Sequence, residues 1–412
     1  MASLCHRGWL LAWISAAGAG IRILAKIAYD GSRYNSLVRR PARVVLLYDV
    51  LGNPGAAFNR IDSHGHLMSR WHLLLAPLMM ACHVAQNASA GSGDLQRDVV
   101  FTEYTALAGN TEIVRRLLSP LAAQMIQAKA RQIGKPLLEQ SIDLSQERYV
   151  LYVPAHVPDV GYGVLVFVPP WNDALLPLGW DAALDAAGII FVSAARSGNG
   201  ESPLARREPL ALLAVQNVLS RYRVNLSRLY VGGFSGGSRI AMRLALAYPD
   251  VFHGALLNAG SDPLGAGESP LPPSDLFRRF QESTRIVFVT GDKDALHLAM
   301  DLASVKSMRH WCVNDFDARI TPFVGHSIVS GAALAEALRS LDSRAPPNPG
   351  ALAACQATIG AAMAAALANV ESLMSRSKTA PVRRALLALD AQYGGLAATQ
   401  TVDLARQCAC VN

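Results

Sequence analysis

The chain has 412 residues, of which 51% are apolar and 17% are charged, a composition that suits a globular protein with a sizeable core. Residues 1–90 hold nine Lys and Arg against three Asp and Glu, a surplus of six, so the rest of the chain carries about +1 of the net charge of +7. No basic tract is left there to bind nucleic acid, and nucleic-acid partners are therefore not expected.

The N-terminal part has two features of an exported protein. Residues 1–67 show no clear element pattern beyond one apolar run, and we predict a non-native or disordered extension there. Residues 68–90 have the parts of a signal peptide, namely Arg70, an apolar run and the Ala-Ser-Ala end of "MSRWHLLLAPLMMACHVAQNASA". Translation is then expected to start at Met68, and the mature chain to begin near Gly91. If Met1 is the true start, the first apolar run is a signal or an anchor. Both alternatives predict a secreted or periplasmic protein.

The cysteines that follow residue 90 number four, as expected of an oxidising compartment. No C-x-x-C pair or Cys/His cluster has metal-ligand spacing, so no metal site is predicted. A disulfide from Cys355 to Cys408 or Cys410 would fasten the C-terminal segment to itself, and reduced thiols, Cys312 included, are the alternative.

The middle of the chain alternates between strand and helix patterns. Residues 91–136 are expected to form a helical segment with a helix over 110–131, and 137–154 to form two strands joined by a turn near Ser145. Apolar runs that predict buried strands then follow at 163–170, 188–195, 228–233, 255–260, 285–290 and 318–325, separated by helical patterns near 177–187, 207–222, 237–248, 296–311 and 330–341. This alternation predicts an α/β domain over 137–342, with a mostly parallel, doubly wound sheet flanked by helices.

The C-terminal part is rich in alanine. Residues 343–350, "SRAPPNPG", are predicted to be a linker, and residues 351–412 a helical extension of two or three helices, one starting at Pro381. No catalytic motif occurs in this extension, so packing is its expected role. No stable membrane span is expected in the mature chain.

A glycine-rich junction between a strand and a helix points to chemistry. Residues 233–237, Gly-Phe-Ser-Gly-Gly, match the pattern G-x-S-x-G between the strand "RLYV" and the helical "RIAMRLALAY". A nucleophile elbow has this setting, because the backbone folds tightly beside a serine on a strained turn. Ser235 is therefore the candidate nucleophile, and a glycine-rich turn without chemistry is the alternative.

A serine nucleophile needs a base and an acid, which follow it in the order Ser, Asp, His. The turn after the strand at 285–290 holds two carboxylates, Asp292 and Asp294, either of which could also cap the next helix. His297 and His310 are expected inside that helix. His326 directly follows a strand and a glycine, and it is the predicted base.

The oxyanion of an ester-cleaving site needs two N–H donors. Gly236, the residue after the nucleophile, is expected to supply one. The second normally comes from the loop after an early strand, here "VFVPPWND", whose prolines have no N–H to give, so Trp171 is the first available donor. Trp171 and Trp180 are also the candidates for lining a substrate pocket, with packing as the alternative.

From about residue 138 to residue 341 the chain resembles α/β-hydrolases of the group that includes secreted polyhydroxybutyrate depolymerases and feruloyl or acetylxylan esterases. The resemblance rests on "RYVLYVP", "RLYVGGFSGGSRIAMRLALAYPDVFHGAL", "VFVTGDKD" and "FVGHS", in that order. It implies the α/β-hydrolase fold and a triad of Ser235, His326 and Asp294, because the acid usually stands fourth in a G-x-x-D turn. Many relatives have His-Gly where this chain has two prolines, a departure that concerns the second oxyanion donor.

These observations predict an exported serine hydrolase that cleaves carboxylic esters, whether of polyester, feruloyl, acetyl or short acyl type, through an acyl-enzyme. No cofactor is expected, and the substrate is a small or polymeric ester. Two alternatives stay open: a peptidase of the prolyl-oligopeptidase type, and a degenerate hydrolase fold that acts as a binding or envelope protein.

Overall fold

The computed structural model describes residues 93–135, 137, 142–376 and 379–409, together with the backbone of three strands nearer the N-terminus. The predicted signal peptide and its start at Met68 lie outside the described residues. The chain divides into two compact units, Met1–Met79 and Met80–Asn412.

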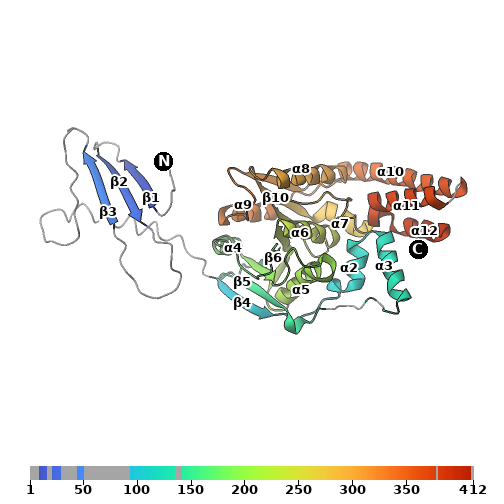
Figure 1. The fold of residues 1–412 in the computed structure, drawn as a ribbon, viewed down its shortest axis with the longest axis horizontal. Helices are drawn as coiled ribbons and strands as arrows, with labels where there is room; N and C mark the ends of the chain where they lie inside the picture. The colour runs from blue at the N-terminus through green and yellow to red at the C-terminus, as the bar shows by residue number, and fades with distance from the viewer. Residues whose placement is uncertain are drawn as a thin grey trace. The chain divides into compact units, whose positions relative to one another are not determined.

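The first unit contains a small antiparallel sheet in the order β1-β2-β3 (Figure 1), made of β1 (Trp9–Ser15), β2 (Ile21–Ala28) and β3 (Val44–Val50). The sequence pattern did not predict these strands. That residues 1–67 are an extension outside the native protein stays a prediction.

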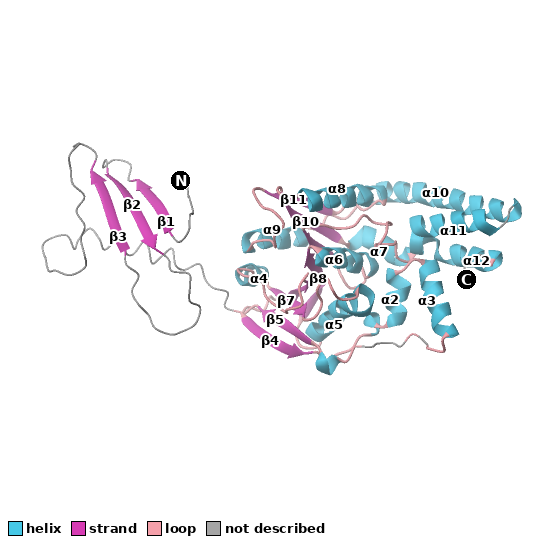
Figure 2. Ribbon diagram, in the orientation of Figure 1, coloured by secondary structure: helices cyan, strands magenta, loops and turns pink. Residues whose placement is uncertain are grey.

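The second unit is built on one sheet of eight strands in the order β11-β10-β9-β8-β6-β7-β5-β4 (Figure 2). All neighbours from β7 to β11 are parallel, whereas β5 is antiparallel to both β7 and β4. The strands are β4 (Asp94–Val100), β5 (Arg148–Val153), β6 (Tyr162–Val168), β7 (Ile189–Ala194), β8 (Val224–Phe234), β9 (Gly254–Asn258), β10 (Arg285–Gly291) and β11 (Phe316–Thr321). The predicted α/β-hydrolase fold is confirmed.

Helices cover both faces of this sheet. Residues of β6 alternate between two apolar clusters, with Val164 and Val166 on one face and Leu165 and Phe167 on the other, as the strand period of two requires. The second face packs against α4 (Asp181–Ala187) and α9 (Gly331–Asp342), and the first against α5 (Glu208–Leu219), α6 (Gly236–Ala247) and α8 (Ala295–His310). Burial on both faces explains why the strands are apolar throughout.

The segment before the parallel strands differs from its prediction. Residues 91–136 begin with β4 and contain two helices, α2 (Asn110–Leu117) and α3 (Pro120–Gln132), which are separated at the proline that starts α3. The partner of β5 is β4, so a hairpin within 137–154 is wrong, and 144–146 form a 3-10 turn instead. The sequence pattern does not predict β4 because this edge strand is polar and contains a bulge. A further helix that the sequence pattern did not predict is α7 (Ser274–Ser283).

The predicted helical extension is confirmed. It consists of α10 (Pro349–Arg376), α11 (Thr379–Tyr393), the short η4 (Gly394–Ala397) and α12 (Ala398–Cys408). In Figure 1 these helices lie side by side at the end of the unit away from β4. Residues of α11 and α12, among them Leu386 and Leu404, belong to the same buried cluster as α5 and α6, so the extension shares the core of the catalytic fold.

One predicted disulfide is wrong. Cys355 of α10 bonds to Cys312, just after α8, with 6.0 Å between the two Cα atoms, and not to Cys408 or Cys410. Cys408 is disulfide-bonded as well. The Cys312–Cys355 bond therefore ties the extension to the hydrolase domain rather than to itself.

Helix α10 is long and apolar enough, by length and composition alone, to cross a membrane, and it is the one such helix among the described residues. Only 6% of the most apolar stretch of α10 is buried, although residues such as Ile359 and Met363 pack against the core. The absence of a membrane span stays a prediction.

The disulfide yields a stability prediction. Replacing Cys355 by alanine should lower the free energy of unfolding by about 3–4 kcal/mol, because the bond closes a 43-residue loop whose entropy the unfolded chain regains. Urea titration of the wild type and the variant measures this, and a non-reducing peptide map should show the 312 and 355 peptides linked only in the wild type. A map that joins Cys355 to Cys408 would contradict the pairing.

Candidate active site

Ser235 lies on a strained turn between β8 and α6. Its backbone adopts φ 55° and ψ −121°, a conformation that L-residues rarely occupy and that costs about 1–3 kcal/mol. Two close approaches hold it there, because a Cβ on Gly233 would collide with the backbone of Gly237, and a Cβ on Gly237 with the carbonyl of Val168. The backbone N–H of Ser235 donates to the carbonyl of Asn258 at 2.9 Å. The glycines of the motif are therefore steric requirements of this turn.

His326 connects the serine to an acid. Its Nε2 lies 3.0 Å from Ser235 Oγ, and its Nδ1 lies 2.6 Å from Asp294 Oδ2. Asp294 follows β10 and His326 follows β11, so two adjacent parallel strands deliver the pair. Asp292, the alternative acid, has its Oδ2 3.5 Å from the Nζ of Lys293, whereas His326 Nδ1 hydrogen-bonds to Asp294. The structure thus brings together the three side chains that were predicted.

Backbone contacts fix the spacing between the acid and the base. The N–H of Asp292 donates to the carbonyl of Thr321, and the N–H of Lys293 donates to the carbonyl of Val324 at 2.9 Å. A Cβ on Gly291 would collide with that same Val324 carbonyl. The loops after β10 and β11 therefore lie as close as a glycine permits, and the Asp–His hydrogen bond depends on this approach.

His297 is a member of the site that the sequence analysis assigned only to a helix. Its Nδ1 lies 2.8 and 2.9 Å from the two carboxylate oxygens of Asp294. Its ring stacks on His326 with centroids 4.1 Å apart and an interplanar angle of 16°, while Phe234 stacks on His326 with centroids 4.8 Å apart. The His326 imidazole is held by two rings and a carboxylate. A histidine three residues after the acid, on the first turn of a helix, was the available signal.

The charge of Asp294 is well supported. Burial favours the neutral acid, but the hydrogen bonds from His297 and His326 outweigh it and hold the pKa of Asp294 below its ordinary 3.8. A second buried carboxylate, Asp301 of α8, differs from Asp294. It accepts hydrogen bonds from Ser261 and Thr290, and burial raises the pKa of Asp301 to about 6. Because the pKa of Asp294 is depressed, its carboxylate is charged throughout the neutral range.

The two tryptophans predicted to line a pocket differ in their surroundings. Trp180 is fully buried, donates from Nε1 to the carbonyl of Val329 at 2.9 Å and packs edge-on against Phe167 and Phe191. Its predicted role in substrate binding is wrong, since no solvent reaches it. Trp171 is half-buried, with its ring 6.2 Å from that of Phe234, and so it lies beside the elbow.

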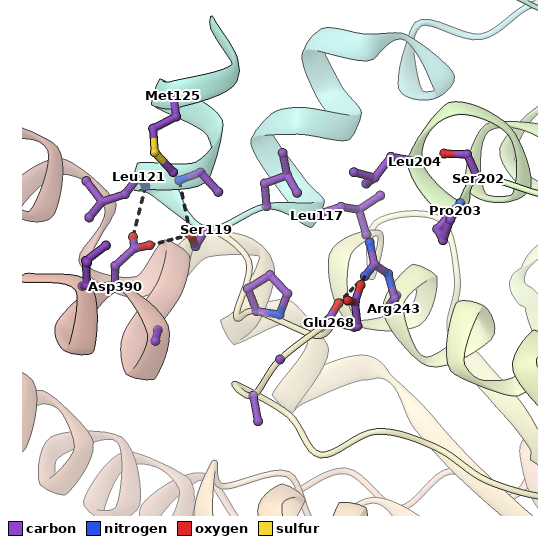
Figure 3. Close-up of a pocket in the computed structure, with 17 residues that line it drawn as sticks. Leu117, Ser119, Leu121, Met125, Ser202, Pro203, Leu204, Arg243, Glu268 and Asp390 are labelled. Atoms are coloured by element: carbon purple, nitrogen blue, oxygen red, sulfur yellow. Dashed lines mark hydrogen bonds and ion pairs between the residues drawn. The ribbon is translucent and has the colours of Figure 1, made fainter. Parts of the chain in front are cut away.

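One cavity among the described residues has no triad residue in its lining (Figure 3). It has a volume of about 520 Å³ between the α2–α3 junction, α6, the loop 266–270 and α11. Arg243 and Glu268 form an ion pair on one wall, and on another Asp390 accepts hydrogen bonds from Ser119 and from the backbone of Leu121.

Among the described residues, Asp294, His297 and His326 are also the one group of acidic, His or Cys side chains close enough to share a metal ion, with ligand atoms within 4.8 Å of one another. Those atoms already hydrogen-bond to each other, and Nε2 of His326 faces a serine hydroxyl. These polar atoms are therefore already paired with one another in the arrangement of a proton-transfer chain.

Comparison with known proteins finds similar solved structures but assigns no family. No protein-family model and no curated protein matches the chain. Similar solved structures include an S-formylglutathione hydrolase from Staphylococcus aureus (11% identity, 47% of this chain, 90% of that chain, TM-score 0.38). They also include an acetyl xylan esterase from Aspergillus awamori (13%, 47%, 94%, 0.37) and a dipeptidyl aminopeptidase IV from Bacteroides ovatus (12%, 81%, 43%, 0.38). At these values the assignment of the fold rests on the strand order, and activity must be argued from the site.

His297 gives a test of how the site is held. Replacing His297 by alanine removes one hydrogen bond to the Asp294 carboxylate, a class of bond worth about 1.5–3 kcal/mol, together with the ring that stacks on His326. Turnover of a reactive ester should fall about tenfold or more with little change in KM. His297→Phe keeps a ring without the donor and so separates the two contributions.

The matched control is His310→Ala, at the other end of the same helix, which should leave turnover unchanged. Full activity in His297→Ala would show that His326 and Asp294 need no second imidazole.

Proposed function

We propose that the protein is a serine hydrolase that cleaves carboxylic esters through an acyl-enzyme. One observation carries the proposal: a serine on a strained elbow, 3.0 Å from a histidine whose other nitrogen lies 2.6 Å from a buried aspartate. A non-enzymatic protein has no need to maintain a strained serine in this alignment.

In the acylation step, Ser235 Oγ attacks the ester carbonyl while His326 Nε2 takes its proton. The imidazolium so formed is stabilised by the charged Asp294, which keeps the ring oriented and does not itself take the proton. The tetrahedral intermediate collapses when the C–O bond to the alcohol breaks and His326 returns the proton to the departing alkoxide.

Deacylation repeats these steps with water. His326 takes a proton from water as the water oxygen attacks the acyl carbonyl, and the second tetrahedral intermediate releases the carboxylic acid while Ser235 Oγ recovers its proton. The ester and one water become an alcohol and an acid, so no oxidant or other co-reactant is required.

Both intermediates carry an oxyanion that needs fixed donors. The backbone N–H of Gly236, at the first position of α6, is the first donor, and the start of the helix adds the favourable end of its dipole. The predicted second donor is the backbone N–H of Trp171, the first available in the loop after β6 because Pro169 and Pro170 have none.

An export route is part of the proposal. The support is the predicted signal peptide at 68–90 together with the Cys312–Cys355 disulfide, since such bonds persist in oxidising compartments. The binding-protein alternative draws support from the proline pair after β6 and the alanine-rich extension. Amide substrates assayed beside esters address the peptidase alternative.

Fluorophosphonate labelling of purified protein tests the function. The wild type should label and Ser235→Ala should not, because the probe reacts only with an activated serine. Asp294→Asn should lower kcat about 10⁴-fold, because the histidine loses its orienting charge. Asp292→Asn is the matched control and should stay within about twofold of wild type.

A folded wild type that does not label would refute the hydrolase. Equal losses in Asp292→Asn and Asp294→Asn would refute this assignment of the acid.

A further inference from the structure

The loop that normally completes an oxyanion site has lost its nearest donors. The carbonyl of Val168, at the end of β6, lies against Gly237 so closely that a Cβ there would collide with it. The next two residues of the chain are Pro169 and Pro170, which have no N–H. The backbone positions that lie closest to the start of α6 therefore offer an oxyanion no hydrogen bond.

A second loop, residues 196–199 after β7, is bound to this one by three hydrogen bonds. The N–H of Arg196 donates to the carbonyl of Asn172 at 2.7 Å, the N–H of Gly198 to Asn172 Oδ1 at 3.0 Å, and the N–H of Asn199 to the carbonyl of Pro170 at 3.0 Å. The two loops behave as one structural piece, and Asn199 is attached directly to the proline pair.

The side chain of Arg207 hydrogen-bonds to both loops. Its side chain is 4% exposed, and it donates from Nε to the carbonyl of Ser197 at 2.8 Å and from a terminal nitrogen to the carbonyl of Pro169 at 3.0 Å. Burial lowers the pKa of Arg207 to about 10, so the guanidinium stays charged at neutral pH. The buried, charged guanidinium donates to one carbonyl in each loop, and these charge-assisted hydrogen bonds restrict movement of the two loops relative to each other.

The side-chain amide of Asn199 lies on Gly236, the residue that gives the first oxyanion donor. A Cβ on Gly236 would collide with Asn199 Oδ1 and lie 2.7 Å from its Cγ and 2.9 Å from its Nδ2. Only glycine lets the amide approach so closely. The Asn199 side chain is exposed and hydrogen-bonds to no residue in the described part of the chain, so its two N–H groups are free for a ligand.

We infer that the carboxamide of Asn199 donates the second hydrogen bond to the oxyanion of the tetrahedral intermediate, in place of a backbone N–H of the proline loop; this inference rests on the proposed ester hydrolysis. The amide of Asn199 lies against Gly236, the residue that follows Ser235 and supplies the first donor, and rotation about the Cβ–Cγ bond of Asn199 would turn Nδ2 toward the oxyanion. Asn199 is on this account a catalytic residue, since it touches the reacting oxygen.

The consequence for kinetics is specific. A donor that meets the oxygen only when it becomes an anion acts on turnover rather than on binding, and removal of one such donor typically costs about 10²–10³ in kcat. Asn199→Ala should show this loss with KM within about threefold of wild type, and labelling by a fluorophosphonate should slow in parallel. Asn199→Asp, which keeps the shape but adds a charge and removes both N–H groups, should lose at least as much.

A thionoester separates a donor from a structural role. Sulfur accepts hydrogen bonds poorly, so the wild type should prefer an ester to its C=S analogue, and Asn199→Ala should lose much of that preference because the ester alone depends on the amide. Asn225→Ala, in the half-buried start of β8 at the end of that strand away from Ser235, is the matched asparagine control and should change neither rate nor preference. Thermal unfolding of each variant checks that the fold is retained.

The outcomes are distinct. A wild type that labels, with Asn199→Ala within threefold of its kcat or with an unchanged ester-to-thionoester ratio, overturns this inference and returns the role to Trp171. A wild type that neither labels nor cleaves esters overturns the proposed function, and this inference with it. A slow Asn199→Ala with a reduced ratio establishes the amide as the second donor.

Discussion

The strained turn at Ser235 is the constraint on which the rest of the site depends. A positive φ at a non-glycine residue persists only where its surroundings leave no alternative, and here those surroundings are backbone atoms that approach to the limit set by glycine on either side of the serine. The ends of β6 and β8 are brought together by the parallel sheet, whose helices bury both faces. The stability of the buried sheet offsets the small free-energy cost of the strained backbone at Ser235.

Two further pairs of loops position Asp294, His326 and Asn199, and hydrogen bonds to backbone groups hold each pair together. The loops after β10 and β11 meet at Gly291 and set the distance from Asp294 to His326, while the loops after β6 and β7 are joined near Asn199 and held by Arg207. Preorganised dipoles of this kind are the main source of rate acceleration in acyl transfer. The proline pair, which removes two N–H donors from the loop after β6, is hydrogen-bonded to the loop that carries Asn199.

The C-terminal extension belongs energetically to the hydrolase domain. Its helices α11 and α12 contribute to the main buried cluster, a disulfide joins α10 to the end of α8, and residues of α11 form one wall of the cavity in Figure 3. An appended segment with a separate function would not need to share a core in this way. The exposed, alanine-rich face of α10 has no described partner in the second unit.

The sequence alone predicted the fold class and the succession of buried strands along the chain, and the family resemblance added Ser235, Asp294 and His326 as the candidate triad, because buried strands and glycine turns are local patterns that a linear reading detects. It did not determine which residues pack beside them. The edge strand β4 is too polar to be recognised from the sequence, and Trp180 lies in the core rather than in a pocket. The structure also shows that Cys355 bonds to Cys312, that His297 stacks on His326 and that Asn199 lies against Gly236. Contacts between loops that leave different strands depend on the order of strands in the sheet, and tertiary structure alone decides that.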